Sequence, residues 1–252
     1  MSTNMLRKLL PFLVAGSVLS GCATGPNAHP DDPLEPLNRG IYAFNDTVDR
    51  AVVKPVSEAY KAITPDPIDK GVTNFFNNIE DVGVMVNNVL QFKFVNALSD
   101  LSRIMVNTSF GLLGVIDVAT MWGLEKHNED FGQTLGYWGL DAGPYLVLPI
   151  FGPSSVRDGV GFVADWYIDP VTHVHPERDR WVLVILRAID TRADLLAASG
   201  VLEETAMDPY ETLRDAYLQR RRFLVADGKE IVGDNGFNED DLLRAAPPPP
   251  AN

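Results

Sequence analysis

Two consecutive segments, 72–90 and 94–107, constrain the fold most, because both carry apolar residues at three- and four-residue spacing. At 100° per residue this spacing places the apolar side chains on one face of a helix. The opposite faces lack the Lys and Glu of an ordinary surface helix and hold mainly amides and hydroxyls. Such faces indicate one of two things. Either they meet an environment that is neither bulk water nor dry core, or their amides cap and bridge neighbouring helices. The polar residues are Asn74, Asn77, Asn78, Asp81 and Asn88 in the first segment, and Asn96, Ser99, Asp100, Arg103 and Asn107 in the second.

The N-terminus has the pattern of a bacterial lipoprotein leader. Arg7 and Lys8 precede an apolar run over 9–19 that is too short to span a bilayer and has the length of a signal-peptide apolar region. The run ends in Leu-Ser-Gly-Cys22, and Cys22 is the only cysteine of the 252 residues. This end resembles the lipobox, in which the cysteine is acylated and becomes the mature N-terminus. The alternative is a free thiol in a short N-terminal anchor.

Lipidation would anchor the chain to a membrane without spanning it. One acyl chain binds marginally, at roughly 0.8 kcal/mol per buried methylene, so the two or three chains of a lipoprotein are needed for stable attachment. Ala23 follows the cysteine, and by resemblance to sorting in enteric bacteria a residue other than Asp favours the outer membrane. We therefore predict an outer-membrane, lipid-anchored protein on the periplasmic side.

The charge balance is acidic. The whole chain carries −13, and removal of Arg7 and Lys8 with the leader leaves 19 basic against 34 acidic residues, or −15. Such a field does not attract nucleic acid or anionic head groups. Membrane contact must then use apolar surface, and the water-facing part is suited to a basic soluble partner.

The pattern predicts four parts: a signal peptide over 1–21, a lipidated tether over 22–31, a helical domain over 32–227 and an acidic, Pro-rich disordered tail over 228–252. In the domain, one helical face from Leu37 runs until Pro55, and a shorter helix continues to about Ile63. We expect Asp66 to cap the next helix and Pro67 to occupy its first turn.

The segment 132–153 combines five glycines and three prolines with apolar side chains. Proline at this density forbids a continuous helix or central strand, yet the side chains are too apolar for a solvated loop. We predict an apolar hairpin against non-aqueous surroundings, with Trp138 and Tyr145 at an interface and their polar tips wet. The alternative is a long ordered loop over the core.

The C-terminal half predicts three more helices. One begins near Asp158, one runs from Pro176 to Gly200, and the last begins at Asp208 with a capping-box pattern. Three consecutive arginines, 220–222, lie in the final turns of that last helix, where cations suit the helix dipole.

The sequence holds little that supports catalysis. The four histidines show no metal-ligand helical spacing, and there is no nucleophile elbow or phosphate-binding glycine loop. We predict no enzyme activity, no metal and no cofactor.

At several points in the same order the chain resembles the MlaA (VacJ) lipoproteins, over about residues 32–225. The most specific blocks are Gly111-Leu-Leu-Gly-Val-Ile-Asp117, Glu129-Asp-Phe-Gly-Gln-Thr-Leu-Gly136 and Gly143-Pro-Tyr-Leu-Val-Leu-Pro-Ile-Phe-Gly-Pro-Ser154. The resemblance implies an all-α, ring-like helical bundle in the inner leaflet of the outer membrane, with an amphipathic channel. It also implies that stray phospholipids pass inward to a soluble periplasmic carrier protein, and that a trimeric outer-membrane porin holds the ring.

Neutral amide faces suit such a passage, because a lipid head group must move through it without being trapped. From helical phase, the candidate lining residues are Asn74, Asn78, Asp81 and Asn88. The Gly-rich hairpin is a candidate gate, with Gly136, Gly143 and Tyr145 as its hinge and gate residues.

The sequence is also compatible with two other classes of function. A structural lipoprotein that scaffolds a porin or envelope complex would tolerate polar substitutions in the amide faces. A lipid hydrolase would need a nucleophile, for which Ser154 and Ser155 are the candidates.

Overall fold

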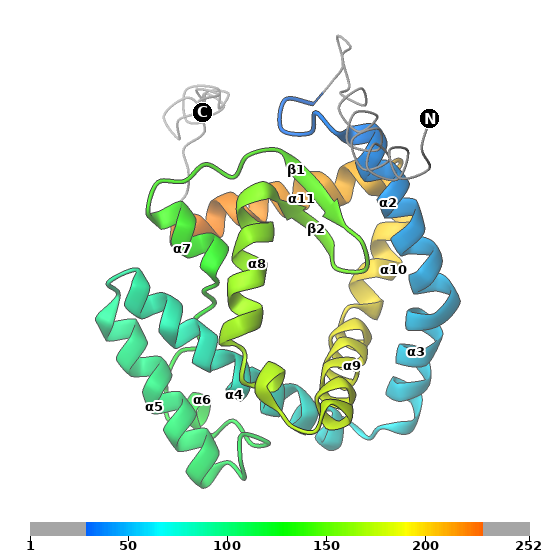
Figure 1. Cartoon of the computed structure of the whole chain (residues 1–252). Coiled ribbons are helices and arrows are strands. Elements are labelled where there is room, and N and C mark those ends of the chain that lie inside the picture. The colour runs from blue at the N-terminus through cyan, green and yellow to red at the C-terminus, as the bar shows by residue number, and fades with distance from the viewer. Residues whose placement is uncertain (1–28, 229–252) are drawn as a thin grey trace, which may run out of the picture.

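The computed structural model describes residues 29–228, so the predicted leader, Cys22 and almost all of the tail lie outside the described residues. The described chain is mostly helical, with one two-stranded hairpin, and its elements form a ring (Figure 1). This confirms the predicted all-α, ring-like fold. The first helices are α2 (Glu35–Val48), the π-helical turn η2 (Asp49–Val53), α3 (Lys54–Ile63), α4 (Asp66–Leu90), α5 (Phe94–Phe110), α6 (Val118–Met121) and α7 (Phe131–Tyr137). The later elements are β1 (Tyr145–Leu148), β2 (Gly152–Ser155), α8 (Val156–Ile168), the 3-10 turn η3 (Pro170–His173), α9 (Glu177–Asp194), α10 (Leu196–Thr205) and α11 (Pro209–Val225).

The start of the domain follows the predicted helical face. Helix α2 continues through the π-helical turn η2 into α3, and Pro55, which has no N–H to donate, follows just after that turn. Asp66 is itself the first residue of α4 and makes no side-chain cap, because the preceding Pro65 occupies the cap position. The prediction of an Asp66 cap was therefore wrong, whereas Pro67 does lie in the first turn.

The predicted hairpin is shorter than the segment 132–153. Strands β1 and β2 pair antiparallel, with Tyr145 opposite Ser155 and Leu148 opposite Gly152. The first part of the segment instead forms α7, because Asp130 caps it by accepting the Gln133 N–H at 2.8 Å and the first proline comes only at Pro144.

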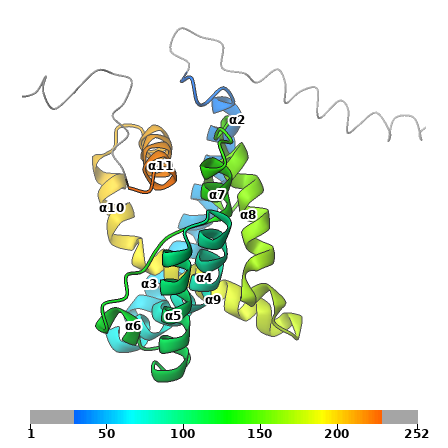
Figure 2. The same ribbon diagram turned by 90° about the vertical axis from the view of Figure 1, so that its left-hand side faces the viewer.

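The C-terminal helices enclose the ring. The predicted helix from Pro176 is divided into α9 and α10, which ends at Thr205 and not at Gly200. Helix α11 begins as predicted, with the Asp208 carboxylate accepting the N–H groups of Tyr210 and Glu211. Figure 2 shows α10 and α11 together on one side of the molecule and α2, α7 and α8 on the other, and α11 contacts α7. Among the helices within 29–228, none is long and apolar enough to cross a membrane.

Candidate functional site

Helices α4 and α5 pack against each other through their polar faces. Asn88 on α4 donates to the Asp100 carboxylate on α5 at 2.7 Å, and Asn78 donates to the Thr108 hydroxyl at 3.1 Å. Asn88 has no exposed surface, and Asp100 is only 1% exposed. The interior of this pair is therefore a layer of amides and carboxylates that hydrogen-bond between the two helices, and within it the side-chain oxygens of Asn78 and Asn88 have no partner among the described residues.

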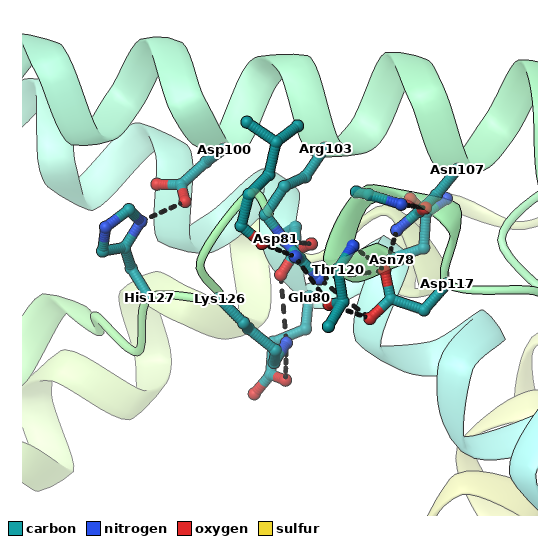
Figure 3. Close-up of polar contacts among 12 residues, drawn as sticks. Asn78, Glu80, Asp81, Asp100, Arg103, Asn107, Asp117, Thr120, Lys126 and His127 are labelled. Atoms are coloured by element: carbon teal, nitrogen blue, oxygen red, sulfur yellow. Dashed lines mark hydrogen bonds and ion pairs between the residues drawn. The ribbon is translucent and has the colours of Figure 1, made fainter. Parts of the chain in front are cut away.

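Arg103 lies at the centre of this layer (Figure 3) and is 1% exposed. Its Nε donates to Asp81 at 3.2 Å, and its Nη1 donates to the Leu124 carbonyl at 2.6 Å and the Thr120 hydroxyl at 3.1 Å. Nη2 lies 3.3 Å from an oxygen of Asp117. A buried guanidinium is tolerated only when its donors are paired in this way, so Arg103 ties α4, α5 and the segment around α6 into one unit.

The partners of Arg103 are held in turn by their neighbours. Burial opposes ionisation of Asp117, but hydrogen bonds from Thr120 and Asn107, with the charge of Arg103, outweigh it and lower the Asp117 pKa. The Lys126 ammonium lies 3.0 Å from the Asp81 carboxylate and so gives this buried carboxylate a second positively charged partner. The carboxylates of Asp81 and Asp117 are therefore both paired with basic side chains.

The four residues predicted to line a channel all belong to this unit or to its edge. Asn78, Asp81 and Asn88 are at most 7% exposed and contact α5. Asn74 donates to the Val115 carbonyl in the loop after α5, at 3.1 Å. Their side chains thus hydrogen-bond to other parts of the chain, as expected for amides that bridge neighbouring helices, and their role as channel lining stays a prediction. Helical phase identified the polar face but not the element that covers it.

The apolar faces of the same helices point outward. On α5, Val95 is 83% exposed, Leu98 65% and Met105 62%. The loop after α5 presents Leu112 and Leu113, each with a positive φ that non-glycine residues rarely adopt. Both leucines are about 70% exposed, so backbone strain is tolerated here while large apolar side chains stay on the surface. A continuous apolar exterior of this kind marks contact with a membrane or a partner.

The β-hairpin is attached to α2 by two asparagines. Asn38, fully buried, donates to the Tyr145 carbonyl at 3.0 Å and accepts the Val147 N–H at 3.0 Å. Asn45 repeats this pairing with the Leu148 carbonyl at 2.9 Å and the Ile150 N–H at 2.7 Å. These amides imitate a third strand, so the edge of β1 is covered, while Ile150 at the tip is 72% exposed.

The predicted gate residues occupy three different environments. Tyr145 is fully buried, and its hydroxyl has no hydrogen-bond partner among the described residues. The prediction of a wet tip was therefore wrong, because the ring packs within 6.3 Å of Tyr210 and 5.9 Å of Tyr217. Gly136 is tightly packed, since an added Cβ would lie 2.8 Å from Val225. Gly143 is exposed and has φ +66°, a conformation that favours glycine.

Helix α11 is held to the ring by ion pairs. Arg221 bridges the carboxylates of Asp130, at 2.5 Å, and Asp158, at 2.9 Å, and Tyr217 donates to Asp158 at 2.6 Å. Burial disfavours the charged form of both acids, but Arg221, with Tyr217 at Asp158, more than compensates and lowers the pKa of each. The three predicted C-terminal arginines are thus not equivalent, because Arg221 joins helices far apart in sequence.

Asp165 on α8 behaves oppositely. It accepts the Phe131 N–H at 3.0 Å and the Asn87 amide at 3.2 Å, and so joins α8 to α7 and α4. Burial, with the nearby negative charge of Asp130, raises its pKa to about 6 despite these hydrogen bonds. Ionisation of Asp165 is therefore unfavourable in the fold.

Comparison with known proteins decides the family. The family model described as "MlaA lipoprotein" matches residues 30–224. The chain belongs to the MlaA lipoprotein family. It is 34% identical to the intermembrane phospholipid transport system lipoprotein MlaA of Escherichia coli (strain K12), over 94% of this chain and 98% of that protein. The protein of the same name from Haemophilus influenzae is 33% identical, again over 94% and 98% of the two chains.

A solved structure also resembles this member of the MlaA family. It belongs to work on the "Structural basis for maintenance of bacterial outer membrane lipid asymmetry" and superposes with a TM-score of 0.67 at 35% identity. The match covers 77% of this chain and 98% of the other. An uncharacterized protein of Rickettsia prowazekii (strain Madrid E) is 35% identical over 77% of this chain and 78% of its own.

The serines considered as nucleophiles have structural contacts in this MlaA-family chain. Ser155 caps α8 by accepting the Asp158 N–H at 3.1 Å, and Ser154 donates to the Ser155 carbonyl at 3.2 Å. Within 29–228 no hydrogen bond joins either hydroxyl to a histidine, and no group of three or more His, Cys, Asp or Glu side chains there could hold a metal ion.

The Arg103 network is what sequence reasoning missed. On α5 its members Asp100, Arg103 and Asn107 are three and four residues apart, and on α4 Asp81 and Asn88 are two helical turns apart. Two polar stripes with opposite charges predict that the two helices pack against each other through their polar faces. This prediction can be made from the sequence only if the apolar faces of both helices are known to remain exposed.

Proposed function

We propose that this chain moves mislocalised phospholipids from the outer leaflet of a bacterial outer membrane toward a periplasmic carrier, and so maintains lipid asymmetry. The relatives named above are lipoproteins of an intermembrane phospholipid transport system. The observation that carries the proposal to this chain is the reversed polarity of α4 and α5. Their charged and amide groups are buried, while Leu98 and Met105 are more than 60% exposed. A helix pair of this kind is best solvated by lipid.

The energetic need for such a protein is large. Exposing two acyl chains of about fifteen methylenes each to water costs roughly 24 kcal/mol at ~0.8 kcal/mol per methylene. A ring that shields the chains from water along its path removes most of that barrier. The transfer then needs no covalent chemistry, and its direction comes from the downstream carrier or the lipid gradient.

The proposal includes an anchor and two partners. Cys22 carries the lipid that keeps the chain at the periplasmic side of the outer membrane. The family resemblance supports a trimeric porin as the protein that holds the ring in the bilayer. The mature charge of −15 favours a soluble carrier with a basic docking surface.

Asn78, Asp81 and Asn88 have a positioning role in this proposal, since they fix α4 against α5. Gly143 is proposed as the hinge of the segment that leads into the hairpin. A Cβ at this position would lie 3.3 Å from Val156, and the left-handed backbone would be strained by any side chain. Gly143→Val should therefore reduce transport more than Gly139→Val, since an added Cβ at Gly139 meets nothing within 4 Å and both positions have positive φ.

The deciding experiment measures phospholipid in the outer leaflet with a membrane-impermeant, amine-reactive label. Cells lacking the gene should show more label than wild-type cells, and the wild-type gene should restore the low level. Cys22→Ala should fail to restore it at equal protein level. Unchanged surface phospholipid in the deletion strain would overturn the transport proposal and favour the scaffold.

A further inference from the structure

A pocket of about 680 Å³ lies between α11, the start of α8 and the loop from α7 to β1. Its volume is in the range of small-molecule sites. Gly136, Gly143, Leu140 and Tyr217 are among its lining residues, and the contacts of Asp158 with Arg221 and Tyr217 described above form part of its wall. The two glycines singled out from the sequence therefore meet at one cavity.

Three arginines line this pocket: Arg157 from α8, with Arg221 and Arg222 from α11. The concentration is notable in a chain with 34 acidic and 21 basic residues. The Arg157 side chain is only 7% exposed, and its Nη1 has a single long contact of 3.4 Å, to the Leu140 carbonyl. Arg222 has one partner within the described residues, Asp31, and Arg221 keeps a buried Nε without any partner there. Unused guanidinium donors therefore remain on all three.

Three carboxylates line the same pocket: Asp31, Asp141 and Asp158. Asp31 and Asp158 pair with the arginines, whereas Asp141 is exposed and makes no side-chain hydrogen bond to other described residues. Three positive and three negative groups cancel. A simple anion would therefore gain little from the lining as a whole, but a ligand with both charges could satisfy the guanidinium donors and a carboxylate together.

We propose that this pocket binds the zwitterionic head group of a phospholipid, a phosphodiester joined to an ammonium group. The phosphodiester oxygens accept from Arg157 and Arg222, and the ammonium lies toward Asp141. The proposal rests on the proposed function, because it names the class of lipid that such a protein would hold beneath α11. Binding requires no covalent step.

The test uses the full detergent-solubilised chain and glycerophosphoethanolamine, which has the head group but no acyl chains and so does not enter micelles. Broadening of its ³¹P signal on titration gives a dissociation constant. Glycerophosphoglycerol, which lacks the ammonium, and orthophosphate are run in parallel. We expect glycerophosphoethanolamine to bind more tightly than either.

Two variants and a matched control locate the site. Leu140 is 51% exposed and lines the pocket, so Leu140→Trp should fill it and abolish binding without unfolding the chain. Arg222→Gln should weaken binding roughly fivefold, the effect of one charge-assisted hydrogen bond partly screened by water. Arg220→Gln, the same charge change at an exposed neighbour outside the lining, should leave binding unchanged.

The outcomes separate this proposal from the function on which it rests. Equal binding of orthophosphate or glycerophosphoglycerol would overturn the zwitterionic assignment, and binding that survives Leu140→Trp would overturn the location. In cells, Leu140→Trp should raise surface phospholipid. If Leu140→Trp restores the deletion strain fully, the pocket proposal fails while transport stands. If deletion itself changes nothing, transport fails as well.

Discussion

The α4–α5 unit and the end of the ring where the hairpin meets α11 are built in opposite ways. In the α4–α5 unit, Arg103 and its carboxylates form the interior and the aliphatic side chains face outward. At the hairpin end, Tyr145, Val147, Tyr210 and Leu218 form an apolar cluster. Around that cluster are charged pairs such as Arg39 with Asp208, at 2.9 Å.

The difference shows which solvent each region fits. Burying apolar surface is favourable only when the alternative is water, so the hairpin end is organised as an aqueous protein is. In the α4–α5 unit, outward-facing aliphatic groups gain nothing from water, and the helices are held by hydrogen bonds and ion pairs that low-dielectric surroundings strengthen. One chain thus combines a region suited to lipid with a region suited to water.

The largest expected effect comes from removing the charge inside the α4–α5 unit. Arg103→Met keeps much of the side-chain volume but leaves Asp81, 1% exposed, without its guanidinium. Breaking a buried pair from one side costs about 3–5 kcal/mol. Thermal unfolding in detergent should show this loss, with α4 and α5 losing helicity first.

Arg178→Met is the matched control, because the Arg178 side chain is 88% exposed. Its free energy of unfolding should change by less than about 0.5 kcal/mol. If both variants unfold alike, or neither is destabilised, the Arg103 network does not hold the unit together.

At the hairpin end, the corresponding test removes a single hydrogen bond. Tyr210 donates to Asp32 at 2.5 Å, and the two residues are 2% and 0% exposed. Tyr210→Phe keeps the ring in the aromatic cluster but deprives a buried carboxylate of a donor, at a cost of about 1.5–3 kcal/mol. Asp32 keeps Asn38 at 2.8 Å, so the loss should be smaller than that of Arg103→Met. Tyr167→Phe, at a position 72% exposed, should be neutral in the same unfolding assay.

The junction between the regions should respond to pH. Asp165 has a pKa of about 6 in the fold, against an ordinary value of 3.8 for an aspartate side chain. Between these values the folded state keeps a proton that the unfolded state has lost, so its contribution to stability falls as pH rises toward 6. Asp165→Asn can still accept the Phe131 N–H and should remove this loss, gaining about 1–2 kcal/mol at pH 7.5 after allowance for partial exposure.

The same variant should have little effect at pH 4, where Asp165 is largely protonated in the fold. Unfolding curves of wild type and Asp165→Asn, recorded from pH 4 to 8, should therefore diverge as pH rises. Parallel curves would mean that Asp165 carries its charge without cost. Asp130 and Asp158 act in the opposite sense, since their lowered pKa values stabilise the fold at neutral pH and this is lost in acid.

The sequence predicts the positions of the helices better than it predicts which of their faces are covered. Helix positions depend on local periodicity and caps, so α4, α5, α8 and α11 were predicted close to their bounds. Which face is covered depends on the surroundings, and nothing local in Asn78 or Asp81 distinguishes a lipid passage from a polar helix interface. Tyr145 was misplaced for a related reason, because its cover, α11, begins more than sixty residues later in the chain.

The smallest expected effect on folding is the most direct test of the contrast. Leu98 and Met105 are 65% and 62% exposed on α5. Replacing both with Gln should change the free energy of unfolding in detergent by less than about 0.5 kcal/mol, because neither contributes to the polar interior.

Association with lipid vesicles should weaken at least tenfold in the same variant, since a large aliphatic side chain contributes about 1.5–3 kcal/mol when taken fully out of water. Ser109→Gln, at another exposed position of α5, is the control and should change neither quantity. Loss of stability without loss of vesicle binding would mean that these side chains pack against protein. Loss of binding at unchanged stability would mean that the outward face of α5 is a lipid surface, since these side chains would then contribute to lipid binding and not to packing within the protein.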